Sequence, residues 1–427
     1  MLVQPPAFDN IDFKGGNLSS DGGAILLLHY LHRIHLRDKI CQIPFNDHRV
    51  LPAYSNTDIL SQLIAKNLLG YFNQADQSYL QDDPLLSLYF SACSQPTVSR
   101  FFDRVCNQTN VVFKEAITLM ACKYVNNHVK DPILDADSTL AVTYGNQEAS
   151  AFIHHYNEVG YHPLLINEFN SKLLLSALLR TGASYSSNGI IGELQTVLAH
   201  LYNRGNIRFR GDSAFYDTSL MEFLEGEEIT YYIRAKSFTA LRRAIVEDMV
   251  MNDINWMDYS ANNPYYGEIR YDIANCGVTR RIVYKAYITV NENGQISYIP
   301  AIYGMVTNDE EKSPKRAMDF YEKRGASENF TKELKDDFDA KHLSHSNFFE
   351  NEMQFLISAI SYNIFHLFQN AVLTGNDAIM TMNSFRMKFQ KIAVKVTTHA
   401  RKLKLSFSSA YLHNRQFMKY WNTVLQI

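Results

Sequence analysis

Four residues whose side chains suit phosphate chemistry stand at helical spacing: Tyr321, Arg324, Glu328 and Lys335. About a helix axis they project at roughly 0°, 300°, 340° and 320°, so all four share one face. Ser313 and Pro314 predict where that helix begins, because they supply a side-chain cap and a proline for the first turn. A carboxylate flanked by cations can bind a metal ion or a phosphate, but the pattern is also typical of a salt-bridged surface helix. From this helix alone, the surface helix is favoured.

Two further carboxylates follow predicted strands. Asp137 ends the short strand that begins at Ile133, and Asp212 follows the strand predicted for residues 207–210. Functional groups in α/β folds collect where strands end, so we expect these two acids to meet Glu328 there. Three such carboxylates would repel one another unless cations held them, and two Mg²⁺ ions about 3.5–4 Å apart are the usual solution. The three acids therefore predict a two-metal site for attack on phosphorus, in which Mn²⁺ can replace Mg²⁺.

The elements around these acids predict an α/β fold. Alternating strand and helix patterns from residue 131 onward indicate a core built on a mixed sheet. Helical periodicity dominates before this core, and β-like alternation interrupts it. We expect five segments: a helical domain (1–130), the first part of the core (131–236), a β-rich insertion (237–306), the second part of the core with the acid-bearing helix (307–375) and a basic tail (376–427).

The N-terminal segment contains a pattern similar to a helix-turn-helix. A helix is predicted from Pro84, a break at residues 94–96, and a second helix from Thr97 that carries Arg100. A helix that follows a tight break and opens with hydroxylated residues and an arginine is typical of a DNA-reading element. Any helical hairpin would give the same pattern and is commoner, so both interpretations stay open.

The C-terminal tail fits a polyanionic partner. No Asp or Glu follows Asp377, whereas nine basic residues do: Arg386, Lys388, Lys391, Lys395, Arg401, Lys402, Lys404, Arg415 and Lys419. The whole chain has a formal net charge of -3, so only this local excess of positive charge argues for nucleic acid. We expect the tail to be helical, and a solvated helix face would explain its charges equally well.

Composition indicates a cytoplasmic protein. The five cysteines are scattered and none is spaced as C-x-x-C, which argues against a disulfide framework and against a structural zinc site. The N-terminus lacks the basic and apolar regions of a signal peptide. The apolar runs at residues 24–31 and 355–365 are too short to span a bilayer, so we expect no membrane association.

An ordered set of motifs resembles the DDE transposases of bacterial insertion sequences, which belong to the ribonuclease-H-like integrase superfamily. The spacing Tyr321-x2-Arg324-x3-Glu328-x6-Lys335 is similar to their Y-R-E-K signature. Further stretches look like one branch of that family: residues 70–71, 94–101, 134–139, 145–148, 162–165 and 210–216, and the basic C-terminal end. The resemblance therefore covers nearly the whole chain.

The resemblance implies a ribonuclease-H-like core and a role for each motif residue. Asp137, Asp212 and Glu328 would form the catalytic, metal-binding triad. Asp135 competes with Asp137, which is preferred because in related enzymes the acid directly precedes the hydroxylated pair. The residues expected to contact DNA are Tyr321, Arg324, Lys332, Lys335, Arg100 and Arg210.

Four more residues depart from this pattern or extend it. Ala149 replaces a frequent glycine and Thr331 a usual aliphatic residue, and we expect neither to touch the triad. Glu148 could assist the site, although an ordinary loop acid is favoured. Trp256 falls in the β-rich insertion, where relatives can stack a flipped base on an aromatic ring, but a core tryptophan is favoured.

The residues and the resemblance together predict a cut-and-paste DNA transposase. Its N-terminal domain would bind the terminal inverted repeats in double-stranded DNA, and its core would cut and join the strands. Because two ends must be paired, we expect a homodimer on DNA. Two alternatives stay open: a transposase-derived DNA-binding protein without activity, and a plain metal-dependent nuclease on the same core.

Overall fold

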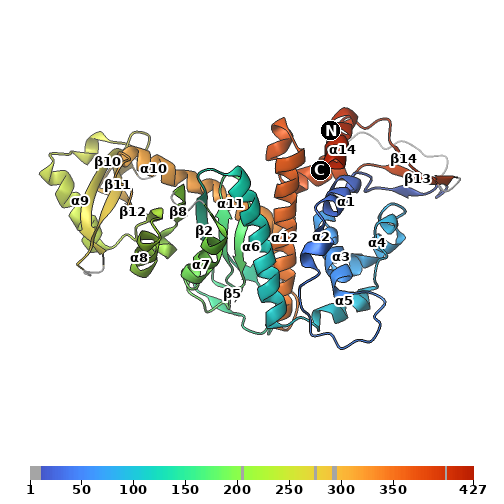
Figure 1. Ribbon diagram of the computed structural model, residues 1–427. Coiled ribbons are helices and arrows are strands. Elements are labelled where there is room, and N and C mark those ends of the chain that lie inside the picture. The colour runs from blue at the N-terminus through green and yellow to red at the C-terminus, as the bar shows by residue number, and fades with distance from the viewer. Residues whose placement is uncertain (1–10, 203–205, 274–276, 291–295, 400–401) are drawn as a thin grey trace. The chain divides into compact units, whose positions relative to one another are not determined.

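The computed structural model describes residues 11–427 apart from 203–205, 274–276, 291–295 and 400–401 (Figure 1). The chain forms two compact units. Unit 1 comprises the described residues up to Val105 together with Leu367–Ile427, and unit 2 comprises Cys106–His366. The boundary falls inside one long helix, α12 (Phe348–Val372).

Unit 2 is organised around an eight-stranded sheet in the order β10-β11-β12-β9-β8-β2-β6-β7. Its strands are β2 (Ile133–Ser138), β6 (Leu164–Glu168), β7 (Leu174–Leu178), β8 (Arg208–Gly211), β9 (Thr230–Arg234), β10 (Tyr265–Asp272), β11 (Thr279–Val290) and β12 (Ile296–Thr307). β2, β8 and β9 run parallel, whereas all other neighbouring pairs are antiparallel. β6 is buried along its whole length, as expected of a strand covered on both faces.

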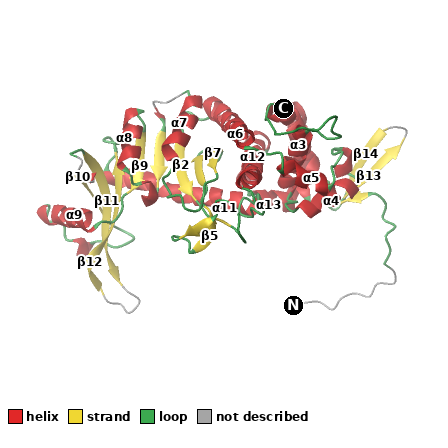
Figure 2. Ribbon diagram, turned by 90° about the horizontal axis from the view of Figure 1, so that it is seen from below, coloured by secondary structure: helices red, strands yellow, loops and turns green. Residues whose placement is uncertain are grey.

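Helices cover both faces of this sheet, as Figure 2 shows. On one face lie α6 (Asn107–His128), α7 (Ile190–His200) and α8 (Thr218–Gly226), and on the other lies α11 (Ser327–Asp337). α10 (Pro314–Glu322) packs on β9, β10 and β11. The single helix expected from Ser313 is thus two helices, joined by a 3-10 turn at Lys323–Ala326 that contains Gly325. A separate small sheet has the order β3-β5-β4, made of Ala141–Val142, Glu158–Tyr161 and Ala151–Ile153.

The predicted α/β class is confirmed, but the segments divide differently from the expected ranges. α6, expected in the N-terminal helical domain, packs on β7 and α7 in unit 2. The segment 237–306 contains the expected strands β10, β11 and β12, but it opens with a helix, α9 (Thr239–Met251). Its strands extend the central sheet, because β12 pairs antiparallel with β9. Periodicity describes an element but not the surface it packs on, which explains these differences.

Unit 1 joins the two ends of the chain. Its helices are α1 (Ala24–Arg33), α2 (Leu36–Ile40), α3 (Asn56–Leu69), α4 (Gln77–Asp82), α5 (Gln95–Phe102), α13 (Met382–Phe385) and α14 (Asn414–Gln426). The carboxylate of Asp21 is buried and accepts hydrogen bonds from Tyr71, Gln390 and Lys391. Arg386 donates to the last carbonyls of α3. These contacts tie the C-terminal segment to the N-terminal helices.

The prediction of a helical C-terminal tail is wrong over residues 394–399 and 402–407, and residues 400–401 lie outside the described part of the chain. β13 (Val394–His399) and β14 (Lys402–Phe407) form an antiparallel hairpin, and β13 also pairs with β1 (Leu18–Ser19). The parts of the tail that are helical, as expected, are α13 with the turn Arg386–Gln390 that follows it, and the last helix, α14. Apolar and polar residues alternate with a period of two along both strands, which is the β pattern.

Candidate active site

Asp137 and Asp212 lie at the same edge of the central sheet. Asp137 is the second-last residue of β2, and Asp212 directly follows the last residue of β8. Because β2 and β8 are parallel neighbours, their carboxyl ends meet there. Asp212 also accepts a hydrogen bond on Oδ1 from the backbone N–H of Ala214 at 2.8 Å, which orients its side chain. Two acids predicted from separate segments therefore come together.

Arg324 provides the positive charge between these two carboxylates. Its Nη2 atom lies 3.6 Å from Oδ1 of Asp137 and 3.8 Å from Oδ2 of Asp212. The guanidinium is nine-tenths buried, and its Nε has no hydrogen-bond partner among the described residues. Asp137 is 17% exposed and Asp212 is 39% exposed, so the pair opens to solvent on the Asp212 side. A cation thus occupies the position where two acids converge.

α11 meets β2 along a regular ladder of side-chain contacts. Ser327, Thr331 and Lys335 stand four residues apart, and Asp135, Asp137 and Thr139 stand two residues apart. Four helical residues rise about 6 Å and two strand residues about 6.6 Å, so the two periods match. Each helix residue hydrogen-bonds the matching strand residue, with Thr331 to Asp137 at 2.8 Å and Lys335 to Thr139 at 3.2 Å. The expectation that Thr331 does not touch the triad is therefore wrong.

Burial controls the protonation of the groups at this edge. It raises the pKa of the Asp137 carboxyl, and the nearby charge of Asp212 raises it further, while Arg324 and the Thr331 hydroxyl oppose the shift. Burial also lowers the pKa of the Lys335 ammonium. Tyr156, which the sequence did not single out, donates to the carbonyl of Ser138 at 3.1 Å. Burial raises the pKa of Tyr156 to about 12, so its hydroxyl keeps its proton.

Asp135 has a structural role, which leaves Asp137 as the acid of β2 that faces the site. The Asp135 carboxylate is 1% exposed and accepts two hydrogen bonds from Arg210, at 2.6 and 2.7 Å. Arg210 is fully buried and lies 4.4 Å from the ring centroid of Phe169. The prediction that Arg210 contacts DNA is therefore wrong, because its guanidinium is enclosed and paired. β2–β8 pairing, which places Arg210 opposite Asp135, decides this role.

The side chain of Glu328 is not part of the cluster that Asp137, Asp212 and Arg324 form. It is exposed on α11, and the described residues form no ion pair or hydrogen bond with its side chain. In the part of the chain that the structure describes, no group of three His, Cys, Asp or Glu side chains is close enough to hold a metal ion. Glu328 nevertheless stands on α11, the same helix that carries Ser327 and Thr331. Its place in the triad stays a prediction.

The remaining residues expected to contact DNA divide into exposed and buried ones. Lys332 is exposed on α11, and Lys335 is half-buried. Tyr321 is 9% exposed and packs in an apolar cluster whose other members are Tyr232, Val283, Met305, Ala317 and Met318. Its ring therefore anchors α10 to the sheet, and the structure does not present it to a DNA backbone.

Glu148, Ala149 and Trp256 lie outside this cluster of charges. Glu148 accepts a hydrogen bond on Oε2 from the backbone N–H of Phe348 at 2.8 Å, so it stabilises the start of α12. Ala149 has φ 61°, a left-handed conformation that explains why glycine is frequent there. Trp256 is half-buried rather than a core residue, and its indole N–H donates to the carbonyl of Tyr298 at 3.2 Å.

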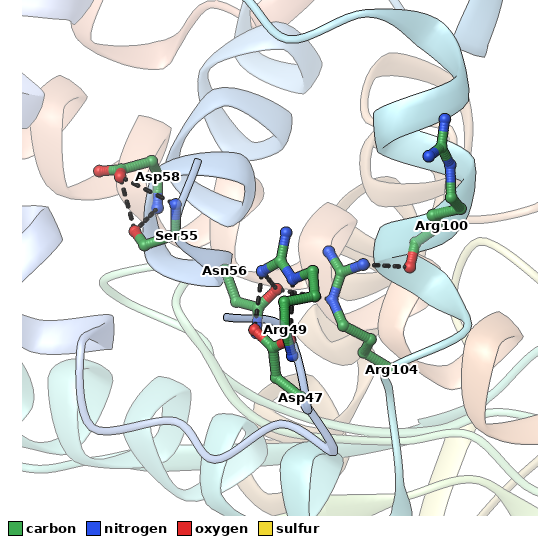
Figure 3. A network of polar contacts seen from close by, with 7 residues as sticks. All are labelled: Asp47, Arg49, Ser55, Asn56, Asp58, Arg100 and Arg104. Atoms are coloured by element: carbon green, nitrogen blue, oxygen red, sulfur yellow. Dashed lines mark hydrogen bonds and ion pairs between the residues drawn. The ribbon is translucent and has the colours of Figure 1, made fainter. Parts of the chain in front are cut away.

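Arg100 lies in a separate polar network of unit 1, shown in Figure 3. Its guanidinium Nε bonds the carbonyl of Pro96, and its own carbonyl accepts a hydrogen bond from Arg104 at 2.6 Å. Asn56 Oδ1, at the start of α3, accepts hydrogen bonds from both Arg104 and Arg49. The helix expected from Pro84 is only a 3-10 turn at Leu86–Leu88, so residues 84–102 lack the first helix that both the helix-turn-helix and the helical-hairpin interpretation require.

The sequence predicts that its apolar runs do not span a membrane, and the helices of the structure can be compared with this prediction. Among the helices that the structure describes, none combines the length and the apolar character needed to cross a bilayer.

The chain was compared with solved structures, with curated protein sequences and with protein-family models. The piggyBac transposase in its synaptic complex with hairpin DNA shares 12% identity, with a TM-score of 0.48 over 86% of this chain and 80% of that chain. The Drosophila P element transposase in its strand transfer complex shares 10% identity, with a TM-score of 0.25 over 54% of this chain and 50% of that chain. No curated protein sequence matches the chain. The family model for the transposase DDE domain, group 1, matches residues 10–427, and the chain therefore belongs to this family of DDE transposases.

Proposed function

We propose that this protein binds the ends of a mobile element in double-stranded DNA and catalyses metal-dependent strand cleavage and strand transfer. The observation that carries the proposal is the meeting of Asp137 and Asp212 at one sheet edge in a chain of this family. The strand order β7-β6-β2-β8-β9, with β2 antiparallel to β6 and parallel to β8, supports a ribonuclease-H-like core. The source of the element, a bacterial insertion sequence, is part of the proposal.

The donor atoms at this edge fit Mg²⁺, or Mn²⁺ in its place. Carboxylate oxygens are the ligands that these ions prefer, and Asp137 and Asp212 converge within 4 Å of one atom of Arg324. The third ligand would be Glu328, whose side chain is exposed in the first turn of α11. Bound there, the ions would activate a water or a 3′-hydroxyl and stabilise the leaving oxygen.

The chain's own residues then have distinct tasks. While no ion is bound, Arg324 neutralises the two carboxylates, and with ions in place its guanidinium would be available for the DNA phosphate that the sequence predicts it to contact. Thr331 orients Asp137 through its hydrogen bond. Lys335 places a cation beside Thr139, where it can hold a DNA phosphate. Lys332 is exposed on the same helix and can make a second phosphate contact.

The test is a cleavage assay with end-labelled duplex carrying the sequences that flank the gene. Asp137→Asn, Asp212→Asn and Glu328→Gln should each abolish Mg²⁺-dependent cleavage and leave duplex binding in place. Asp336→Asn, on an exposed acid of the same helix, is the matched control and should cleave normally. Cleavage that survives in the Glu328 variant alone would remove Glu328 from the site, and cleavage that survives in all three would overturn the proposal.

The exposed position of Glu328 favours one alternative, a DNA-binding protein that has lost its chemistry. Wild-type protein that binds the duplex but never nicks it in Mg²⁺ or Mn²⁺ would establish this alternative. A plain nuclease would cut but would not join a 3′-hydroxyl end to a target plasmid. We also propose that the active form is a homodimer on DNA, and mass measurement of the complex with both ends present should give two protein chains.

A further inference from the structure

The hairpin of β13 and β14 has two chemically different faces. Directly opposite residues of an antiparallel pair share a face, and successive residues alternate between faces. The register pairs Lys395 with Ser406, Thr397 with Lys404 and His399 with Lys402, so these six residues form one face. We call it the basic face. The other face consists of Val394, Val396, Thr398, Leu403, Leu405 and Phe407.

The second face anchors the hairpin within unit 1. Val394 and Val396 are buried, and the ring of Phe407 lies 5.1 Å from the ring of Phe417 in α14. The backbone N–H of Val396 donates to the carbonyl of Asn17 at 2.9 Å, beside the β1–β13 pairing. The strands are therefore held in a fixed orientation, and the basic face is fixed with them.

The basic face carries positive charge that its surroundings do not neutralise. Lys395, His399, Lys402 and Lys404 are exposed, and none of the three lysines forms an ion pair with a carboxylate of the described residues. No Asp or Glu follows Asp377 in the sequence. Asp377 itself is 3% exposed and pairs with Lys388 at 2.6 Å. Holding three lysines on one face without acidic partners is expected of a surface that binds a polyanion.

We propose that the basic face of the β13–β14 hairpin binds duplex DNA as a two-stranded ribbon, separately from the candidate active site. The major groove admits such a ribbon, and six residues per strand span about 20 Å of it. Lysines would contact the phosphates, and the hydroxyl of Ser406 lies on the same face as a further donor, whereas the hydroxyl of Thr397 donates to the carbonyl of Lys404. This inference rests on the proposed function, since it names a DNA contact of the same enzyme.

The test measures duplex affinity as a function of salt by fluorescence anisotropy. The variant Lys395→Gln/Lys402→Gln/Lys404→Gln should bind more weakly at every salt concentration. The slope of log affinity against log salt should become shallower by about 2 to 3, because each lysine on a phosphate releases roughly one counterion. The charge-retaining variant with arginine at the same three positions should restore the slope. The control Lys123→Gln/Lys315→Gln removes exposed cations of unit 2.

Each outcome separates this inference from the proposed function. If the triple glutamine variant binds and cleaves duplex like the wild type, the ribbon assignment fails while the transposase proposal stands. An equal loss in the unit 2 control would also overturn the assignment, because general charge would then explain the effect. Tighter binding of single-stranded RNA or of an acidic protein than of duplex would do the same. Matching circular dichroism and melting temperatures confirm that the variants are folded.

Discussion

The side-chain hydroxyl of Thr331 donates a hydrogen bond to the carboxylate of Asp137 across 2.8 Å. This contact joins α11 to β2 at the point where the strand ends. One turn below it Ser327 reaches Asp135, and one turn above it Lys335 reaches Thr139, so the helix and the strand are in register over three contacts. Asp137 is thereby oriented by a residue 194 positions away from it in the sequence, on a helix that also carries Glu328.

The first prediction concerns that hydroxyl. Thr331→Val keeps the shape of the side chain but removes the donor, so Asp137 loses its orientation. Losing such a supporting hydrogen bond typically costs 10- to 100-fold in activity or metal affinity, and we expect about a 10-fold slower Mg²⁺-dependent cleavage. Thr331→Ser, which keeps the hydroxyl, should cleave at nearly the wild-type rate. Equal rates for the valine variant and the wild type would contradict the role given to this contact.

The second prediction separates the two acids of β2. Asp135→Ala leaves Arg210 charged and unpaired inside the fold, which should lower the free energy of unfolding by about 3–5 kcal/mol. Urea unfolding followed by circular dichroism measures the change. The double variant Asp135→Leu/Arg210→Met removes both charges and should recover much of the loss. Wild-type stability in Asp135→Ala would show that the pair is not what holds β2 to β8.

The sequence predicts those parts of the site that depend on neighbouring residues, and it does not predict those that depend on the pairing of distant strands. The positions of Asp137 and Asp212 at strand ends follow from short apolar runs that stop at an acid, and both were predicted. Asp135 and Asp137 point to the same side of β2, so alternation alone cannot tell the buried acid from the accessible one. The neighbouring strand determines which acid is buried, because β8 places Arg210 against Asp135. The pairing of two strands that are distant in the sequence cannot be predicted from the residues around either acid.

The C-terminal tail shows the opposite case, because its signal was present in the sequence. Residues 394–397 and 402–407 alternate apolar and polar side chains, as in Val394, Lys395, Val396, and this period predicts strands. The charge of a segment indicates which kind of partner it can bind. The period of its apolar residues indicates whether a helix or a strand carries that charge.

The third prediction uses the backbone at Ala149. Its φ of 61° is a conformation that favours glycine, so Ala149→Gly should relieve steric cost in the folded state. Part of that gain is offset by the greater freedom of glycine in the unfolded chain, and the net effect should be a stabilisation of up to about 1 kcal/mol. Gly145→Ala, at φ 123°, should be destabilising and serves as the opposite control. Thermal unfolding measures both, and a clear loss of stability in Ala149→Gly would contradict the argument.

The fourth prediction concerns competition between Arg324 and a divalent cation. Because its Nη2 lies within 4 Å of both carboxylates, Arg324 holds the position that an ion would take between them. Arg324→Met should therefore bind Mn²⁺ more tightly in a calorimetric titration, while cleavage falls because a phosphate contact is lost. Arg324→Lys, which keeps a charge, should bind Mn²⁺ more like the wild type. Weaker Mn²⁺ binding in the methionine variant would show that Arg324 assists the ion instead of competing with it.

The fifth prediction follows from the raised pKa of Asp137. An acid whose folded-state pKa lies above its unfolded value, here 3.8, adds stability below that value and loses it as pH rises through the folded pKa. At neutral pH the metal-free protein therefore holds a buried carboxylate at a cost in stability. Asp137→Asn, which has the same shape without charge, should be more resistant to urea than the wild type in a chelator at about pH 7.5.

That advantage of Asp137→Asn should shrink toward about pH 4, because the wild-type carboxyl then takes up its proton. Asp212→Asn, on the more exposed acid, is the comparison and should gain less. If Asp137→Asn were instead less stable at neutral pH, the attraction between Asp137 and Arg324 would outweigh burial. The Asp137 carboxylate would then stabilise the metal-free protein. Its burial would no longer indicate a site that lowers the stability of the protein in order to bind a cation.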